Sequence, residues 1–593
     1  MAREDFSYES ARLRALGNLT KTVIVPALVL ASLAKATKIK LGYYTIPCYG
    51  LCIFLGSYLQ GLYRGFRLGR DSERLARGRE GSVGSIPVVR GKLPGNIDLI
   101  IRALANQRSG YVHDIFLEWF EEYQSTIINV RLLGIDKFIT MDSEHVKFLL
   151  VTGHRNFFRG DTQKELLETF LGTGILNRDD EMWKAHRTTT RPFFINDRTS
   201  DLGLFDKYIN RTLNHISNVG PNRPIDFEDL AARFTIDTAS EFLFGHNLDT
   251  LSYRADGFDS FVDAFAKIQQ VSLERSIRGG LWPLFEPFGD RSKKYGDVIK
   301  GWVTPLVERA LEHKRKMSEK GHQIQDDQST FLEHLAYSFD DVTIIRDQLI
   351  NLLLAARDTT TALLTYTVYM FTQHPEILAR ARKEVVEALG PDGTPTLEGI
   401  RKLKYLRAVL NETLRLFCPL HGSIRQSRDH GVILPPSDAT YQRGPMYLPP
   451  NSPVFTLPIL IQRNEALWGP DAHIYDPDRW LDERLQRVTS NPAIFIPFGA
   501  GPRNCLGQNY AYNEASLFMI RLLQRFEGFT LAEDKQLPPP WKMNSQHTHH
   551  SKRGMFGPGW PGTKRKAVEK IWPGHNIVLF VKGGLWVRVK KAE

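Results

Sequence analysis

A ten-residue loop with a single cysteine constrains this chain more than any other stretch. It runs from Phe498 to Gly507 and reads Phe-Gly-Ala-Gly-Pro-Arg-Asn-Cys-Leu-Gly. The stretch that follows, 508–526, repeats apolar residues at three- and four-residue spacing, which predicts a helix. A thiol beside a helix N-terminus lies where the helix dipole and the free N–H groups favour the thiolate. A soft anionic sulfur in an apolar pocket opened by glycines suits an iron ion.

The spacing around Cys505 argues against a buried structural cysteine, which is the usual role of a lone Cys. Given average composition, about one window in a million would match all five fixed positions by chance. These positions are Phe498, Gly501, Arg503, Cys505 and Gly507. We expect Gly501 and Gly507 to let the backbone lie flat against a large planar cofactor. We expect Arg503 to pair with an acidic edge of that cofactor.

A second constraint is the long helix predicted over 340–374. Asp340 or Asp341 can cap it and Pro375 ends it, and at 1.5 Å per residue it would extend about 50 Å. Its apolar middle changes abruptly at Ala355-Ala356-Arg357-Asp358-Thr359-Thr360-Thr361. An acid–alcohol pair, Asp358 and Thr359, among small residues leaves room for a cofactor, oxygen and water. The alternative is a buried polar cluster that bonds only to its own backbone.

Two pairs of helical neighbours add weaker signals. Trp183 and Arg187 lie four residues apart on a predicted helix and therefore share a face. Glu412 and Arg415 are also helical neighbours, and their apolar flanks indicate burial. Because a buried ion pair needs further partners, we expect Arg479 to join them.

In this order and spacing, the four motifs resemble those of the cytochrome P-450 family, from about residue 140 to the C-terminus. The resemblance implies a mainly α fold with a small β region. It implies haem b with Cys505 as the iron ligand, and Glu412, Arg415 and Arg479 as a triad that locks the core. Asp358 and Thr359 would be the catalytic residues, delivering protons to O2. The haem-binding residues would be Phe498, Gly501, Arg503, Gly507, Trp183, Arg187 and Arg425. One departure is Ala356, where the family has glycine.

The resemblance implies a monooxygenase that inserts one oxygen atom from O2 into a lipophilic substrate. Electrons must come from outside, because no Gly-x-Gly-x-x-Gly in the chain follows a predicted strand and opens a helix, as a dinucleotide-binding fingerprint does. A separate NADPH-dependent flavoprotein reductase is implied, docking on the Cys505 side, with cytochrome b5 as a second candidate donor. The segment 226–245, a predicted core helix, resembles the fungal branch that hydroxylates alkanes and fatty acids. The alternatives are a broad xenobiotic or polyaromatic oxidase, a haem protein without monooxygenase turnover, and a peroxide isomerase or dehydratase that needs no reductase.

Charge is concentrated at the two ends of the chain. Residues 1–80 carry a net +7 and residues 541–593 carry +9, whereas 81–540 carry −5 within the total of +11. An acidic body argues against nucleic acid as a partner, and basic ends fit an anionic membrane surface. The four cysteines form no disulfide framework, which is typical of a reducing compartment.

Residues 1–80 are predicted to form a membrane anchor and linker. The run 41–63 has no charged residue and is long enough to cross a bilayer, and six arginines follow it between Arg64 and Arg79. This pattern predicts the endoplasmic reticulum membrane, with the catalytic domain in the cytosol. A second apolar run, 22–34, is an interfacial segment or one half of a two-span hairpin. A secretory signal over 1–36 is disfavoured because Lys35 stands at its cleavage site.

Residues 81–593 are predicted to form the catalytic domain. It begins with a Pro- and Gly-containing linker, 81–100, and carries a basic loop insertion near 542–574. Three histidines in that insertion, His547, His549 and His550, are disfavoured as a metal site because no acidic or cysteine ligand lies nearby.

Overall fold

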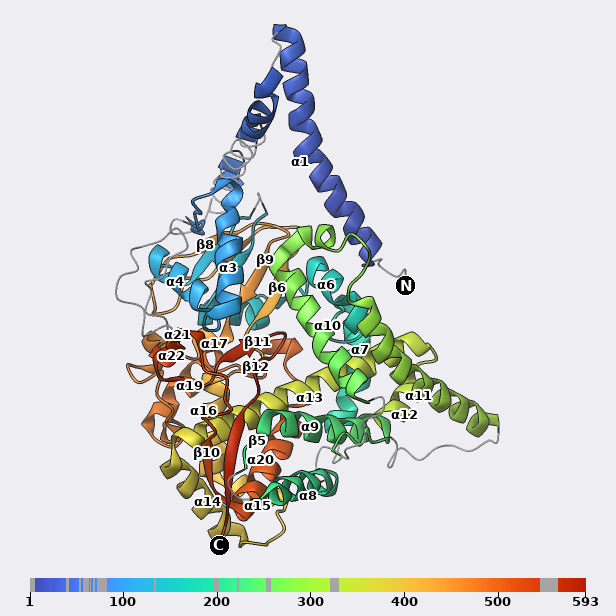
Figure 1. Cartoon of the computed structure of the whole chain (residues 1–593), viewed down its shortest axis with the longest axis vertical. Coiled ribbons are helices and arrows are strands. Elements are labelled where there is room, and N and C mark those ends of the chain that lie inside the picture. Colours follow the sequence, from blue (N-terminus) through green and yellow to red (C-terminus); the bar gives the residue numbers. More distant parts are fainter. Residues whose placement is uncertain are drawn as a thin grey trace.

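A single long helix, α13 (Val342–Gln373), runs through the middle of the molecule (Figure 1). The Asp341 side chain caps it by accepting from the backbone N–H groups of Thr343 and Ile344. The helix ends at His374 because Pro375 follows, and Pro375 begins α14. Most α13 side chains are buried, so the helix forms the spine of the core. This confirms the helix predicted over 340–374.

The computed structural model describes residues 6–38, 42–52, 55, 56, 63, 66, 67, 70, 71, 83–132, 135–195, 202–220, 223–251, 258–319, 330–543 and 564–593. Helices dominate these residues, which confirms the predicted mainly α class. Besides α13, the helices are α1 Tyr8–Thr37, α3 Ile97–Ser109, α4 Asp114–Tyr123, α5 Ser143–Lys147, α6 Asp161–Leu171, α7 Asp180–Ile195, α8 Leu202–Val219, α9 Phe227–Phe244, α10 Phe258–Arg278, α11 Lys293–Glu319, α12 Phe331–Ser338, α14 Pro375–Leu389, α15 Leu397–Lys402, α16 Lys404–Leu416, α17 Pro458–Ile461, α18 Glu465–Trp468, α19 Gln486–Ser490, α20 Gln508–Arg525, α21 Pro540–Met543 and α22 Lys564–Val568.

The strands are short and lie in small sheets. The largest described sheet has the order β2-β3-β9-β6-β4, with Phe138 paired to Val454 in parallel and Ser423 paired to Thr456 in antiparallel register. The other described sheets are β1-β8-β7, β10-β13-β5 and β11-β12. The strands are β1 Gly84–Ser85, β2 Ile127–Asn129, β3 Phe138–Thr140, β4 Phe157–Phe158, β5 Ile225–Asp226, β6 Ser423–Ser427, β7 Val432–Leu434, β8 Met446–Leu448, β9 Pro453–Thr456, β10 Phe526–Leu531, β11 Pro573–His575, β12 Leu579–Val581 and β13 Trp586–Lys591.

The core is built on both sides of α13. One large apolar cluster joins the C-terminal half of α13 to α8, α14, α16 and α20, and a second joins its N-terminal half to α6, α10 and α11. Helix α9 packs along α13; its N-cap is Asp226 and it ends at Gly245 in the left-handed conformation, as its sequence predicts.

Some predicted elements differ in detail. The helix that carries Glu412 and Arg415 begins at Lys404, because the chain breaks at Leu403 between α15 and α16. β10 and β13 pair in antiparallel register, so the residues between them form a long insertion between two partner strands. Within the predicted linker 81–100, β1 already pairs with β8 and α3 begins at Ile97.

The N-terminal helix α1 projects away from the body and includes the apolar run 22–34 (Figure 1). No helix in the described part of the chain combines the length and apolarity that a membrane crossing requires. The predicted span 41–63 lies partly outside the described residues, and so does the basic insertion near 542–574. His547, His549 and His550 also lie outside them.

Candidate active site

The Cys505 loop is a tight turn fixed by its own backbone. The Cys505 N–H donates to the Phe498 carbonyl at 2.9 Å, and the Phe498 ring lies 5.0 Å from the Tyr512 ring of α20. Gly501 adopts φ +68°, and a Cβ there would overlap the Leu150 carbonyl. The loop therefore needs glycine at 501 because it presses on the segment at Leu150, whereas the sequence suggested contact with a cofactor. Gly507 has only the Phe194 ring within 4 Å of a Cβ position, so the space beside it is open.

Cys505 lies on the wall of a hollow of about 520 Å³ and is exposed through it. The lining residues are Trp183, Arg187, Arg191, Pro502, Asn504, Cys505 and Leu506. Protein nevertheless surrounds the sulfur closely enough that desolvation raises the pKa of the Cys505 thiol. The Gly507 N–H and the Arg187 charge oppose that rise because both favour the thiolate. A bound cation would add the remaining stabilisation that a thiolate needs.

Helix α7 brings the predicted Trp–Arg pair to this loop. Arg187 donates to the Asn504 carbonyl at 3.0 Å and to the Asn504 Oδ1 at 2.6 Å. Its guanidinium lies 5.8 Å from the centre of the Trp183 ring, which confirms that the two residues share a face. Arg503 covers the same ring at 4.4 Å. The tryptophan therefore holds two arginines of the site by cation–π contact.

Positive charge is concentrated next to Arg503. Arg503 pairs with Asp179 at 2.6 Å, and burial lowers its pKa to about 10. Arg425 on β6 is buried and donates only to nearby acceptors, the Ser423 Oγ and the Ile424 carbonyl. Burial, with repulsion from Arg159 and Arg503, holds the pKa of Arg425 well below its usual value, although Asp179 opposes that shift.

This arrangement fits a cofactor that carries carboxylates. Three neighbouring arginines share Asp179, and among the described residues Arg425 forms no ion pair with a carboxylate. The Nε of Arg159 is buried and has no hydrogen-bond partner. Buried cations that lack counter-ions are costly unless a ligand supplies the negative charge. Haem requires a ligand for its iron and cations for its carboxylates. A thiol on one element and arginines with too few carboxylate partners on its neighbours supply both.

The centre of α13 presents the acid–alcohol pair. The Thr359 hydroxyl donates to the Ala355 carbonyl at 2.6 Å, a bond that loosens a helix locally. The two Asp358 oxygens accept from Arg357 at 2.8 Å and from Gln269 of α10 at 2.8 Å. Asp358 is therefore held by two protein donors, one on each carboxylate oxygen.

Glu514 is a buried carboxyl on α20, the helix that follows the Cys505 loop, and among the described residues neither of its oxygens has a hydrogen-bond partner. Burial raises the pKa of this carboxyl to about 8, and the nearby Thr360 hydroxyl of α13 offsets only part of that rise. No described contact joins Asp358 or Thr359 directly to the Cys505 loop. Sequence reasoning missed Glu514, Arg159 and Asp179. The signals in the sequence were Glu514, a carboxylate on the buried face of the helix after Cys505, and Arg159, an arginine between Phe158 and Gly160.

The predicted charged triad is present behind this site. Arg415 binds Glu412 at 2.7 Å, and the Nε of Arg479 lies 3.6 Å from the same carboxylate. Trp480 donates to Glu412 at 3.0 Å. All three charged side chains are buried, and Asp471 is a second partner of Arg479 at 2.9 Å.

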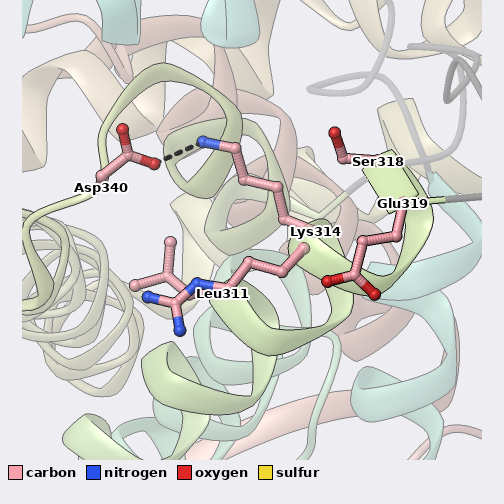
Figure 2. A pocket seen from close by; sticks show the side chains of 6 residues that line it. Leu311, Lys314, Ser318, Glu319 and Asp340 are labelled. Atoms are coloured by element: carbon pink, nitrogen blue, oxygen red, sulfur yellow. Dashed lines mark hydrogen bonds and ion pairs between the residues drawn. The ribbon is translucent and has the colours of Figure 1, made fainter. Parts of the chain in front are cut away.

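A second hollow, of about 350 Å³, lies at the C-terminal end of α11 (Figure 2). Figure 2 shows Lys314 reaching Asp340, and the two form an ion pair of 2.8 Å. Leu311, Arg315, Ser318 and Glu319 complete the lining. None of these residues is a cysteine, histidine, methionine or tyrosine, so this lining supplies none of the usual axial ligands of haem iron.

Comparison with known proteins agrees with this geometry. Residues 92–556 match the family described as Cytochrome P450. The chain is 32% identical over 433 residues to the cytochrome P450 monooxygenase himC of Aspergillus japonicus, covering 72% of this chain and 75% of that protein. It is 29% identical over 460 residues to cytochrome P450 52A13 of Debaryomyces hansenii, covering 75% and 86%. It is 30% identical over 425 residues to cytochrome P450 52A9 of Candida maltosa, covering 69% and 79%.

Proposed function

The chain belongs to the cytochrome P450 family, and from that premise we propose that it hydroxylates long-chain alkanes or fatty acids at or near the chain end. As a P450 monooxygenase it uses haem with a thiolate-ligated iron, O2 and electrons from a redox partner. Bound haem supplies the oxidising chemistry, and the protein supplies orientation and protons.

In this proposal Cys505 supplies the thiolate ligand, and the Gly507 N–H and Arg187 stabilise its negative charge. Arg187, Arg425 and Arg503 neutralise the cofactor's carboxylates. The surplus of positive charge around Arg425 supports this assignment. Trp183 keeps Arg187 and Arg503 in place, and Phe498 and the two glycines shape the loop.

Thr359 and Asp358 deliver protons on the α13 side. The Thr359 hydroxyl, which donates to the Ala355 carbonyl, would turn from that carbonyl to hold a proton for the O2 chemistry that bound haem would supply. Asp358 accepts a proton from solvent when Gln269 or Arg357 releases one of its oxygens. Compared with the family's glycine, Ala356 adds a methyl group beside Asp358 and Thr359. This methyl group reduces the space next to the two side chains.

The substrate proposal is carried by one observation, the similarity to proteins named cytochrome P450 52 over more than 400 residues. The segment that forms α9, whose text resembles the alkane- and fatty-acid-hydroxylating branch, lies along α13 in the core. An apolar substrate also suits a chain whose N-terminal part is apolar and projects from the body.

We further propose a membrane anchor in residues 1–80, a catalytic domain over 81–593 and a location on the cytosolic face of the endoplasmic reticulum. An NADPH-dependent flavoprotein reductase would donate electrons at the hollow beside Cys505, with cytochrome b5 as a second donor. The exposed apolar side chains of α1 and the cationic lining of that hollow support these assignments.

A spectral titration of the purified holoenzyme tests the substrate. We expect long-chain fatty acids and alkanes to produce the type I shift of the haem spectrum, and product analysis to place the hydroxyl at or near the chain end. If only polyaromatic compounds produced the shift and turned over, the chain-end proposal would fail and a xenobiotic role would replace it. Turnover without NADPH would indicate isomerase or dehydratase chemistry instead.

A further inference from the structure

The first residues of the chain are attached to the catalytic body. Phe6 is buried, and the cations of Lys164 and Arg178 lie 5.0 and 5.5 Å from its ring. Tyr8 packs against Trp282 with 5.8 Å between ring centres, and its hydroxyl donates to the Glu286 carbonyl.

The contact continues along the first two turns of α1. Ala11 and Ala15 are 4% and 1% exposed, and Arg14 forms an ion pair with Glu165 of α6. The partners come from α6, from Arg178 between α6 and α7, and from residues 279–286 between α10 and α11, all of which belong to the catalytic body. Because no bilayer can lie between surfaces in contact, residues 6–15 must lie on the same side of any membrane as that body.

Beyond Ala15 the same helix loses its protein partners. Ile24, Val25, Leu28, Val29 and Leu33 are each between 47% and 60% exposed. After the end of α1 the chain remains apolar and exposed at Tyr43, Tyr44 and Ile46. Figure 1 shows this part rising away from the body, and the chain is again part of the body at β1, which pairs with β8. A soluble protein rarely leaves so many large apolar side chains exposed together, and hydrocarbon is the partner of matching chemistry.

Charge marks both ends of the projecting part. Between Leu16 and Ala34 the only charged residue is Lys21. Arg12 and Arg14 precede this stretch, and Arg67 and Arg70 follow the second apolar run. Basic residues at both ends favour the cytosolic side for both ends. Lys35 and Lys38, at the turn, have stems long enough to lie along apolar surface while their ammonium groups stay among headgroups.

We infer that residues 6–15 stay on the cytosolic side, docked on the catalytic body, and that the rest of α1 and residues 42–52 enter the bilayer as a hairpin. This inference rests on the membrane association proposed above. It differs from a single crossing, which would put the first residues on the far side. A hairpin returns to the side from which it enters, so neither limb has to cross.

The test uses the full-length chain in microsomes, with one epitope ahead of Phe6 and another after Glu593. We expect both epitopes to be digested by added protease without detergent, and the chain to remain in the pellet after alkaline carbonate washing. If the first epitope were digested only after detergent, the same-side topology would be wrong while membrane association held. If carbonate released the chain, membrane association would be wrong and the hairpin with it.

A pair of variants tests the docking itself. Ala11→Trp places a large side chain at a buried position, whereas Leu13→Trp makes a similar change at a position that is 70% exposed. Limited trypsin cleavage after Arg14 should accelerate severalfold in Ala11→Trp and stay unchanged in Leu13→Trp, with the haem spectrum unaltered in both. Equal cleavage rates in the two variants would overturn the docking of residues 6–15.

Discussion

Arg425 is the residue whose surroundings most need a ligand. It is buried beside Arg159 and Arg503, whose repulsion is opposed by the nearby carboxylate of Asp179. A buried guanidinium without a counter-ion is costly, because desolvation is not offset by ion pairing. The carboxylates of haem would supply that counter-charge, so the cofactor and this residue should stabilise each other.

We predict that Arg425→Ala weakens haem retention roughly ten- to hundred-fold, because a hydrogen bond to a charged group contributes about 1.5–3 kcal/mol. Transfer of haem to an excess of apomyoglobin measures the rate of loss. Arg428→Ala is the matched control, since Arg428 lies just beyond β6 and pairs with Asp180 at the surface. Equal loss from both variants would contradict the role of Arg425.

At the residue scale, the spacing of nearby residues drew attention to side chains that lie together in the fold. It could not show which residues pair across long stretches of sequence. Cys505, Arg503 and the Trp183–Arg187 pair follow from positions close together in sequence. The ion pair between Arg503 and Asp179 joins residues more than 300 positions apart, so no local pattern shows it. The need for glycine at 501 comes from the Leu150 carbonyl, which also lies far away in sequence.

At the element scale, α13 carries two threonines whose hydroxyls both donate to backbone carbonyls of the helix but whose neighbours differ. Thr359 bonds back to Ala355, and Thr361 bonds back to Arg357 at 2.9 Å while also contacting Thr235 of α9 at 2.8 Å. Thr359→Ala should lower the fraction of NADPH electrons recovered in product by about tenfold, since positioned proton transfer contributes a factor of roughly 10²–10⁴. The reduced-CO spectrum should not change.

Thr361→Ala is the control, because it removes the same kind of back-bond on the same helix. Its coupling of NADPH to product should stay near that of the native chain. If Thr359→Ala were as well coupled as Thr361→Ala, the assignment of Thr359 to proton delivery would be wrong.

The loop after α6 is docked on α13 by helix side chains. Asp347 accepts from the Thr173 N–H at 2.9 Å, and Asn351 accepts from the Leu176 N–H at 2.9 Å. A Cβ at Gly174 would collide with the Asn351 amide. Gly174→Ala should therefore lower the free energy of unfolding by about 1–3 kcal/mol, the usual cost of overpacking.

Gly301→Ala in α11 is the matched substitution, because nothing lies within 4 Å of its Cβ position. Alanine there should be neutral or stabilise the protein by up to about 1 kcal/mol through helix propensity. Thermal unfolding of both holoproteins measures the difference. A stable Gly174→Ala variant would show that the loop docks less tightly than described.

Helices with strong caps were predictable, and short strands were not. The ends of α13 and α9 follow from Asp341, Pro375, Asp226 and Gly245, which act on their immediate neighbours. Many strands are only two or three residues long, too short for alternation to show. The break at Leu403 has no glycine or proline to mark it, so the two helices read as one.

At the scale of the whole molecule, the Cys505 hollow is also a charged surface. Arg187 and Arg191 line it, and Arg191 is exposed. Arg191→Glu should slow reductase-supported turnover roughly tenfold at low salt, because charge complementarity steers association. Reduction by dithionite should not change.

Arg315→Glu makes the same charge change at the hollow of Figure 2 and should leave turnover with the reductase unaffected. Steady-state rates across a range of ionic strength separate the two variants. Equal slowing in both would mean that net charge, rather than the Cys505 face, controls the encounter.

The arrangement of the whole chain was beyond sequence reasoning. The pairing of β10 with β13 across more than 50 intervening residues, and the contact of Phe6 with α6, depend on chain topology that periodicity does not record. The family resemblance supplied the fold class, but the match spans residues 92–556, whereas the motifs suggested a range from about 140 to the C-terminus.

The assignment of Cys505 as the thiolate that holds the haem iron underlies every other role proposed for this site. The reduced-CO difference spectrum tests this assignment. The native chain should give the thiolate-type band. Cys505→Ser should abolish it, while Cys418→Ser, the same change at a buried cysteine bonded to the Leu420 carbonyl, should retain it. A thiolate-type band of unchanged position and intensity in Cys505→Ser would contradict the central claim.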